Sequence, residues 1–414
     1  MAGRRRRKRG RTPLQPVPKP RGFERAVVVL MALGAVVFIE PAPFDLLTIL
    51  LLPAALLLRQ LALPRASGPA IVIIALFVLA NLFSLIPAHA LGHSIRFLAI
   101  TLYLVVLWVF VLGYCGKHKT RALWLIMRGW TIGATLTTGV AILAYFRVIP
   151  FFDLLSPLGR MQAFFKDPNV LGAYLVGPIV WSVSRLVTLE RGRRLGWMIA
   201  LIVCFMGVLL TFSRGAWISA ALGLAGFFAL RMVGRGSQRE RVMTLLMVPA
   251  ALVLLAIALD RLADVTVIQD MLTRRFGMQN YDVDRFATQR EALEVAARTP
   301  FGIGPGQSES TFTRAAHNTY VRGFVENGYL GGIALILSMY LALFVGLWSA
   351  ISSREPRHQV AMAVVAASLA AVCVESVVID TVHWRHPWVL MAMCWTPAGL
   401  RAAAASRRAR APDR

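Results

Sequence analysis

Apolar segments long enough to cross a lipid bilayer recur along almost the whole chain, and this feature restricts the possible folds more than any other. One transmembrane helix needs about 20 predominantly apolar residues. The chain is 57% hydrophobic and only 16% charged, whereas about a quarter of the residues in a soluble domain are charged. The apolar segments are continuous rather than alternating, which is typical of helices and not of a membrane barrel. We therefore predict an all-α, polytopic bundle of transmembrane helices.

Hydropathy predicts about twelve spans, joined mostly by very short loops. The spans are expected at residues 26–40, 44–62, 69–87, 95–114, 122–145, 168–187, 195–212, 215–232, 242–260, 317–350, 358–379 and 386–404. Two connecting segments are longer, 146–167 and 261–316, and the second lies between the ninth and tenth spans. The span at 317–350 is long enough to begin above the membrane or to contain a break. Residues 26–404 are thus expected to form the membrane domain, between basic tails at residues 1–25 and 405–414.

The net charge of +25 is concentrated in the two tails and in every second loop. This alternation is the positive-inside pattern, so we expect both termini to be cytoplasmic and both long loops to face outward. The basic tail is interpreted as a disordered arm that contacts anionic lipid, and nucleic acid is not an expected partner. No disulfide is expected because none of the four cysteines lies in a predicted external loop, and no metal site is expected because their spacing fits none.

Three groups of polar residues lie on the predicted outer side. Ser213-Arg214-Gly215 occupies a tight turn between two apolar spans. The second long loop carries many charges and ends in the glycine-rich run 300–306, which cannot continue a helix or a strand. His317-Asn318 opens the next span, and Glu326 follows nine residues later. Histidine and glutamate are unfavourable at membrane depth, so their presence indicates a functional site.

This combination resembles the bacterial O-antigen ligase and polymerase superfamily over about residues 140–350. The resemblance is carried by Ser-Arg-Gly at the outer turn, by a loop with an arginine and a Gly-x-Gly-x-Gly run, and by His-Asn followed by Glu-x-Gly-x-x-Gly. The segment 164–169, Phe-Phe-Lys-Asp-Pro-Asn, is similar to a motif that the family carries before its middle spans. One position departs from the family pattern, since Gln289 stands where an aromatic residue often follows the loop arginine. The choice between Arg285 and Arg290 therefore stays open; we prefer Arg285 because Ala292 and Leu293 then fall in register.

The resemblance implies a glycosyltransferase in the bacterial cytoplasmic membrane with its active site on the periplasmic side. The donor would be a glycan on undecaprenyl diphosphate. The acceptor would be a sugar hydroxyl, on lipid A–core for a ligase or on another lipid-linked glycan for a polymerase of O-antigen or exopolysaccharide. A lipid or polysaccharide transporter is the alternative from another class, but it would place charges midway through its spans.

The chemistry of arginine and histidine side chains agrees with the activity that the resemblance implies. The leaving diphosphate needs its charge neutralised, and the planar guanidinium of arginine pairs with two phosphate oxygens at once. We expect Arg214 and Arg285 to bind the diphosphate in place of a metal ion, and no cofactor is expected. We expect His317 to accept the proton of the acceptor hydroxyl, because imidazole titrates near neutral pH.

Six further residues are predicted to bind substrate. They are Arg160, Lys166, Asn169, Arg290, Asn318 and Glu326. Asn169 has a simpler interpretation, because Asp167-Pro168-Asn169 is a natural turn and helix start. The glycine run 300–306 is likewise a structural turn more often than a phosphate-binding loop. Two acids near the end of the eleventh span, Glu375 and Asp380, have no partner that the sequence identifies.

Overall fold

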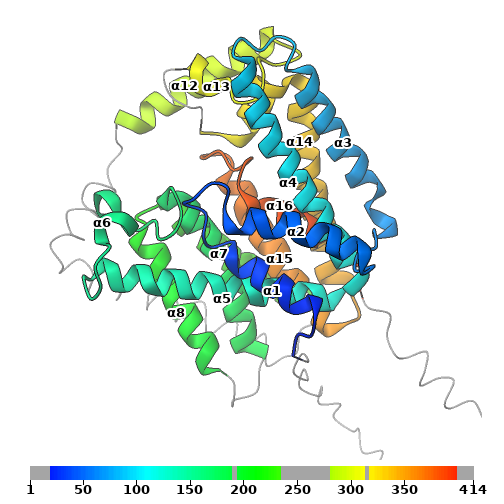
Figure 1. Cartoon of the computed structure of the whole chain (residues 1–414), viewed down its shortest axis with the longest axis vertical. Helices are drawn as coiled ribbons and strands as arrows, with labels where there is room; N and C mark the ends of the chain where they lie inside the picture. The colour runs from blue at the N-terminus through cyan, green and yellow to red at the C-terminus, as the bar shows by residue number, and fades with distance from the viewer. Residues whose placement is uncertain (1–18, 189–193, 235–279, 313–316, 399–414) are drawn as a thin grey trace, which may run out of the picture.

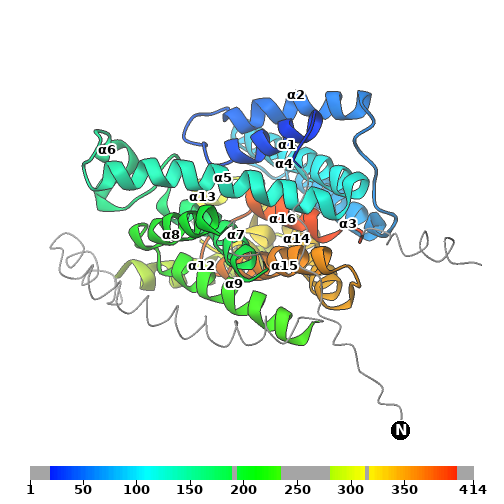
Figure 2. The same cartoon turned by 90° about the horizontal axis from the view of Figure 1, so that it is seen from below.

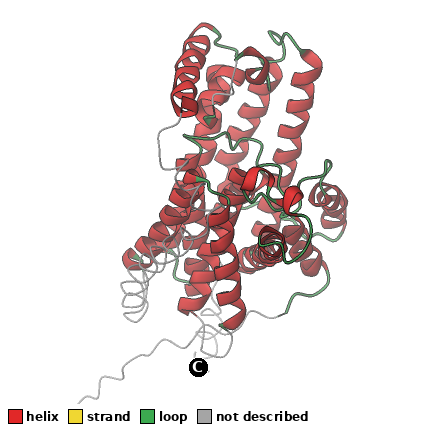
Figure 3. Cartoon of the chain, turned by 90° about the vertical axis from the view of Figure 1, so that its left-hand side faces the viewer, coloured by secondary structure: helices red, strands yellow, loops and turns green. Residues whose placement is uncertain are grey.

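The computed structural model describes residues 19–188, 194–234, 280–312 and 317–398, and all regular structure in these ranges is helical (Figures 1 and 3). The elements are α1 (Phe23–Leu33), α2 (Pro43–Leu57), η1 (Arg65–Ser67), α3 (Gly68–Phe83), α4 (Leu91–His118), α5 (Thr120–Tyr145), α6 (Phe152–Leu155), η2 (Pro157–Gly159), α7 (Pro168–Thr188), α8 (Leu195–Leu210), α9 (Arg214–Val233), α12 (Asn280–Arg298), α13 (Ser308–Thr311), α14 (Thr319–Ser352), α15 (Pro356–Glu375) and α16 (Arg385–Cys394). The predicted all-α class is confirmed for the described part of the chain.

Six helical segments in the described ranges are long and apolar enough to cross a membrane. They are η1 with α3, α4, α7, α9, α14 and α15. Two further apolar helices, α2 and α8, are shorter. Helix α5 lies where a span is predicted, but its several threonines and glycines make it less apolar. A multi-pass membrane protein is therefore confirmed, whereas the expected number of about twelve spans is not.

The first and last predicted spans are shorter than expected. Helix α1 ends at Leu33, and residues 34–42 continue without helical structure to the start of α2. This segment contains one proline, Pro41, and leads into a second, Pro43, at the start of α2. Because proline interrupts helical hydrogen bonding, α1 and α2 do not join into one helix. Helix α16 ends at Cys394 rather than near residue 404. The predicted span at 242–260 lies outside the described residues, as do 261–279 and 313–316 of the second long loop, residues 1–18 of the first tail and the whole tail at 405–414.

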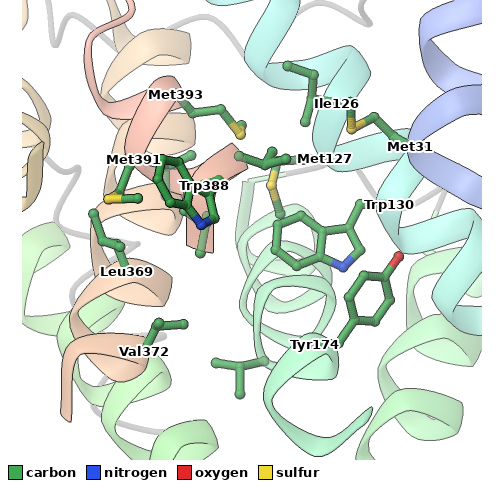
Figure 4. Close-up of a cluster of buried hydrophobic side chains, with 14 of the residues drawn as sticks. Met31, Ile126, Met127, Trp130, Tyr174, Leu369, Val372, Trp388, Met391 and Met393 are labelled. Carbon is green, nitrogen blue, oxygen red and sulfur yellow. The ribbon is translucent and has the colours of Figure 1, made fainter. Parts of the chain in front are cut away.

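Helices α7 and α15 form the interior of the bundle. In the apolar 18-residue stretch of each helix, 83% of α7 and 89% of α15 is buried, compared with 33% for the segment that contains α3. Helix α15 packs against α9, α14 and α16, and Figure 4 shows Leu369 and Val372 of α15 beside Trp388 and Met391 of α16. On another side, α1 lies between α2 and α5 (Figure 2). The less buried α3 therefore offers most of its apolar surface to lipid.

Helices α12 and α13 cover one end of the molecule, near the ends of α3, α4 and α14 (Figure 1). Helix α12 buries Ala292 and Ala296 in a small cluster with Phe312 and with Val321 and Val325 of α14. The second outer loop is thus anchored on the first half of α14, which is the helix that His317 precedes.

Candidate functional site

The turn between α8 and α9 places Arg214 at the start of a helix. Phe212 has a left-handed backbone with φ 48°, and Ser213 caps α9 by accepting a hydrogen bond from the Ala216 N–H at 3.3 Å. Serine is favoured at this position because its oxygen satisfies an unpaired helical N–H. Arg214 is the first residue of α9, and its side chain is exposed. Three residues thus separate α8 from α9, and the arginine lies at the surface.

The first outer loop docks on this turn through Arg160. Its Nε donates to the carbonyl oxygen of Thr211 at 2.9 Å, and another guanidinium nitrogen donates to Asn169 Oδ1 at 3.0 Å. The neighbouring Met161 N–H donates to the Leu210 carbonyl at 2.9 Å. Arg160 and Asn169, which the sequence predicts as substrate-binding residues, thus lie next to the Arg214 turn.

Lys166 belongs to the same loop but binds a different segment. Its Nζ lies 2.5 Å from Oε1 of Glu40, and the Val37 N–H donates to the Phe164 carbonyl at 2.9 Å. The hydrogen bond from Lys166 lowers the pKa of Glu40. These contacts connect the irregular segment 34–42 to the first outer loop.

His317 lies immediately before α14, in a left-handed conformation with φ 44°. The next residue, Asn318, caps the helix: its Oδ1 accepts from the N–H groups of Tyr320 and Val321 at 3.0 and 3.1 Å. The cap of α14 is therefore Asn318 and not His317. The side chain of His317 is half-buried.

The Arg214 turn and the His317 segment approach the same end of α15. The Thr319 N–H donates to the Ser376 carbonyl at 2.9 Å. On the other side of α15, a Cβ placed on Gly215 would lie 3.5 Å from Oε1 of Glu375. Since residues 375 and 376 are adjacent, α9 and α14 both begin beside the carboxyl end of α15. The structure thus brings the two predicted catalytic segments to one region.

The glycine-rich run 300–306 packs against a break in α14 at Gly328, which has φ 65°. The Ile303 and Gly304 N–H groups donate to the carbonyls of Val325 and Glu326 at 2.9 and 3.0 Å, and Tyr329 N–H donates to Pro300 at 3.0 Å. A Cβ on Gly302 would lie 2.4 Å from the Glu326 carbonyl oxygen, so only glycine fits. These backbone groups stabilise the break, which supports the simpler interpretation of the run as a structural turn.

Glu326 fixes this loop from within α14. Its Oε2 accepts from the Gly306 N–H at 2.9 Å, and its Oε1 accepts from the Ser308 hydroxyl. The same oxygen lies 2.9 Å from Nε of Arg322, one helical turn earlier. Glu326 is 2% exposed. In this structure Glu326, which the sequence predicts as a substrate-binding residue, holds other protein groups.

Arg322 is the centre of a buried charge cluster that the sequence analysis did not identify. Its guanidinium forms an ion pair with Asp380 and lies 3.5 Å from Glu309 and 5.4 Å from the centre of the Phe97 ring. The spacing of Arg322 and Glu326 by four residues in an apolar span was the available signal, because such a pair satisfies both charges on one helix face. The cluster joins α13, α14 and the loop after α15, and it supplies the missing partner of Asp380.

Arg290 and Arg285 both lie on α12. Arg290 is exposed. Positions 285, 292 and 296 share one side of the helix by its 3.6-residue repeat, and Ala292 and Ala296 are the residues that face α14. The side chain of Arg285 lies outside the described residues, so the preference for Arg285 stays a prediction.

Comparison with known proteins supplies a family for this part of the chain. A family model described as O-antigen ligase matches residues 199–336, whereas no curated protein matches the sequence. The matched segment begins in α8 and ends in α14. It includes Arg214, Arg285, Arg290, His317, Asn318 and Glu326, while Arg160, Lys166 and Asn169 precede it. The match confirms the resemblance to the O-antigen ligase and polymerase superfamily.

Proposed function

We propose that this membrane protein, with its O-antigen ligase domain at residues 199–336, transfers a glycan from undecaprenyl diphosphate to a sugar hydroxyl at the outer face of the cytoplasmic membrane. The observation that carries the proposal is that the Ser213-Arg214-Gly215 turn and the His317 segment both meet the carboxyl end of α15, at Glu375 and Ser376. A pocket for two substrates needs its diphosphate-binding and acceptor-activating groups close together, and the nearness of these two segments supports the proposal.

The proposed reaction is a single displacement at the anomeric carbon. The acceptor hydroxyl oxygen forms a bond to that carbon while the bond to the diphosphate oxygen breaks, and the electron pair leaves with the diphosphate. His317 orients the acceptor hydroxyl and, as general base, accepts its proton. Because the oxygen attacks opposite the leaving group, the anomeric configuration inverts.

The leaving group is stabilised by cationic side chains in this mechanism. Arg214 is exposed at the N-terminus of α9, where the helix dipole also favours an anion. Arg285 on α12 would approach from the second outer loop and complete the diphosphate site. Arg160 and Asn169 hold the turn that carries Arg214, so they position the site from the first outer loop.

Release of undecaprenyl diphosphate by the purified protein tests this function directly. The full chain in detergent is incubated with the lipid-diphosphate glycan and lipid A–core. We expect release with wild type and almost none with Arg214→Ala, Arg285→Ala or His317→Ala, each of which removes a group that acts in the transition state. Release should continue in the presence of a chelator, and NMR of the product should show inverted anomeric configuration.

Arg147→Ala is the matched control. Arg147 is another exposed arginine near the first outer loop, and its guanidinium lies over the Phe152 ring at 4.8 Å rather than beside the Arg214 turn. We expect this variant to keep wild-type turnover, and all variants should show the same elution volume and melting temperature. Undiminished turnover in the three alanine variants would contradict the mechanism.

The acceptor distinguishes a ligase from a polymerase of the same superfamily. A strain that lacks a ligase accumulates full-length glycan on undecaprenyl diphosphate, because only the final transfer is blocked. A strain that lacks a polymerase accumulates single repeat units instead. Analysis of the lipid-linked glycans in a deletion strain therefore identifies which hydroxyl the enzyme uses.

A further inference from the structure

An open cavity lies at the place where α1 begins, α4 ends and α5 begins (Figure 1). Its volume is about 570 Å³, which is within the range of about 300–1,000 Å³ that is usual for small-molecule sites. Its walls come from the residues that precede α1, from the start of that helix, from the linker after α2 and from the turn between α4 and α5. The positive-inside pattern predicts that this end of the bundle is cytoplasmic.

This cavity lies far from the proposed transfer site. The first residue of α5, Thr120, donates a hydrogen bond to Glu355 at the start of α15, at 2.9 Å. The next residue, Arg121, lines the cavity. The transfer segments instead meet Glu375 and Ser376 at the other end of α15, which is about 30 Å away along a helix of 20 residues. A ligand of this cavity therefore takes no part in the proposed reaction.

The cavity contains more positive than negative charge. Lys19, Arg21 and Arg121 line it together with one acid, Glu24. The Arg121 guanidinium donates to both carboxylate oxygens of Glu24, which also accepts the Arg21 backbone N–H at 3.0 Å. Lys19 and Arg21 are exposed, and their side chains form no ion pair with a described residue. Two cations of the cavity thus lack a counter-charge within the described part of the chain.

Another wall of the cavity is fixed by contacts between α4 and the linker after α2. His118 Nε2 lies 3.1 Å from Oε1 of Gln60, and the His118 ring packs on the Tyr114 ring, with centroids 4.4 Å apart. A Cβ on Gly116 would lie 1.8 Å from the Ala62 carbonyl oxygen, so the close contact of linker and helix requires glycine. This wall is therefore held by the protein itself, which lowers the cost of binding a ligand.

Apolar surface adjoins the cavity on the side of α2. Gln60 lines the cavity, and its side-chain amide donates to the Leu58 carbonyl at 2.9 Å. Leu58 and the two leucines before it, at the end of α2, are 58–83% exposed. In a membrane protein such a surface is suited to contact lipid chains. A molecule that carries a negative charge on an apolar tail would match both neighbouring surfaces.

We propose that this cavity binds the head group of an anionic phospholipid from the cytoplasmic leaflet. The phosphate accepts hydrogen bonds from the Arg21 guanidinium, which can pair with two oxygens at once, and from the Lys19 ammonium. A zwitterionic head group brings its own cation close to these side chains, so it binds less well. The chain's own basic tail cannot supply the anion, because residues 1–18 contain several arginines and no acidic residue.

Native mass spectrometry of the full-length protein in detergent, titrated with phosphatidylglycerol, tests the proposal. Neither turnover nor a glycan is needed, so the result is independent of the proposed transfer reaction. We expect Lys19→Gln combined with Arg21→Gln to lower the affinity for phosphatidylglycerol roughly ten- to thirtyfold, since each basic residue beside an anionic lipid contributes about fivefold. Phosphatidylcholine should bind weakly to wild type and should not respond to the two substitutions.

Glu24→Gln should have the opposite effect. It keeps the size of the side chain, removes the negative charge that faces the cavity and releases the Arg121 guanidinium for the lipid phosphate. We expect the affinity for phosphatidylglycerol to rise about fivefold, which is the contribution of one charge. A purely structural role of Glu24 would lower the affinity or leave it unchanged, and either result would contradict the proposal.

Arg65→Gln combined with Arg128→Gln is the matched control. Both arginines are exposed and neither lines the cavity, so this variant loses the same charge and should keep wild-type affinity. An equal loss of affinity in the control and in the cavity variant would indicate diffuse attraction to the surface and overturn the proposal. Unchanged affinity in the cavity variant would overturn it as well.

Glycerol 3-phosphate distinguishes a lipid from a soluble ligand, because it carries the phosphate without the apolar chains. We expect it to bind much more weakly than phosphatidylglycerol, since it makes no contact with the leucines at the end of α2. If it binds as tightly, the cavity takes a soluble phosphate compound and the lipid assignment is wrong.

Discussion

Arg160 and Thr211 are joined by a hydrogen bond of 2.9 Å from the guanidinium Nε to the carbonyl oxygen, and this contact fastens the first outer loop to the turn that carries Arg214. The same guanidinium reaches Asn169 at the start of α7. One side chain thus connects three segments that are separated in the sequence. Its fork geometry is needed because two acceptors lie in different directions.

Arg160→Lys should lower both the stability and the activity of the protein. A lysine ammonium cannot reproduce the planar pair of donors, so one hydrogen bond is lost, at about 0.5–1.5 kcal/mol. We expect a lower melting temperature and a several-fold reduction in the release of undecaprenyl diphosphate. Arg147→Lys, at an arginine whose guanidinium lies over the Phe152 ring rather than beside the Arg214 turn, should change neither quantity. A wild-type melting temperature and rate for Arg160→Lys would show that the contact has no role.

Arg322→Met should be among the most destabilising substitutions in the chain. Arg322 pairs with Asp380 and Glu326 in a buried cluster, and removing one partner of such a cluster costs about 3–5 kcal/mol because the remaining charges stay buried. Thermal unfolding in detergent measures the effect. Adding Asp380→Asn to Arg322→Met should recover part of the loss, because one uncompensated charge disappears. Strictly additive losses in the double variant would contradict the pairing.

Gly328→Ala should disturb the break in α14. The residue has φ 65°, and a Cβ would lie 2.2 Å from the carbonyl oxygen of Pro300. The backbone at φ 65° and ψ −170° is essentially restricted to glycine and alone costs alanine about 1–3 kcal/mol, and the clash adds to it by displacing the run 300–306. Gly92→Ala, where nothing lies within 4 Å of the added carbon, should leave the melting temperature unchanged. Equal melting temperatures for Gly328→Ala and Gly92→Ala would contradict the prediction.

The stability of the fold should decrease as pH falls from about 6.5 towards 4, with a contribution from His383. Burial and, to a smaller extent, the nearby Arg322 lower the pKa of His383 against the opposing effects of Asp380 and Glu326, and the resulting pKa is about 4. The unfolded histidine binds a proton below about pH 6.5, whereas the folded one stays neutral until about pH 4. In this window the unfolded state therefore binds more protons, so acid favours unfolding.

Melting temperatures measured between pH 7.5 and 4 test this linkage. His383→Gln removes the titrating group and should flatten the pH dependence between about 6.5 and 4. His89→Gln serves as the control, because His89 is exposed and should leave the wild-type slope in place. An identical slope in wild type and His383→Gln would exclude His383 as its source.

The sequence predicted the class of fold because hydropathy is a local property. Spans expected at 69–87, 168–187 and 358–379 coincide with α3, α7 and α15, within a few residues. The possible break in the span at 317–350 is confirmed at Gly328. The first span was predicted too long because hydropathy alone does not register the prolines that follow Gly34. The charge pattern delimited the second outer loop. It did not predict that Ala292 and Ala296 of this loop pack on α14.

The sequence alone determined that this chain is a helical membrane protein and which residues carry the family resemblance. Both follow from apolar length and motif spacing, which are properties of consecutive residues. Only the tertiary structure decided which of those residues meet. Gly215 reaches Glu375 and Thr319 reaches Ser376 across more than 50 positions, and the rings of Trp130, Tyr174 and His386 meet from three helices. The physical reason is that such contacts depend on how whole helices pack, and no local pattern of residues specifies the partner of a buried polar group.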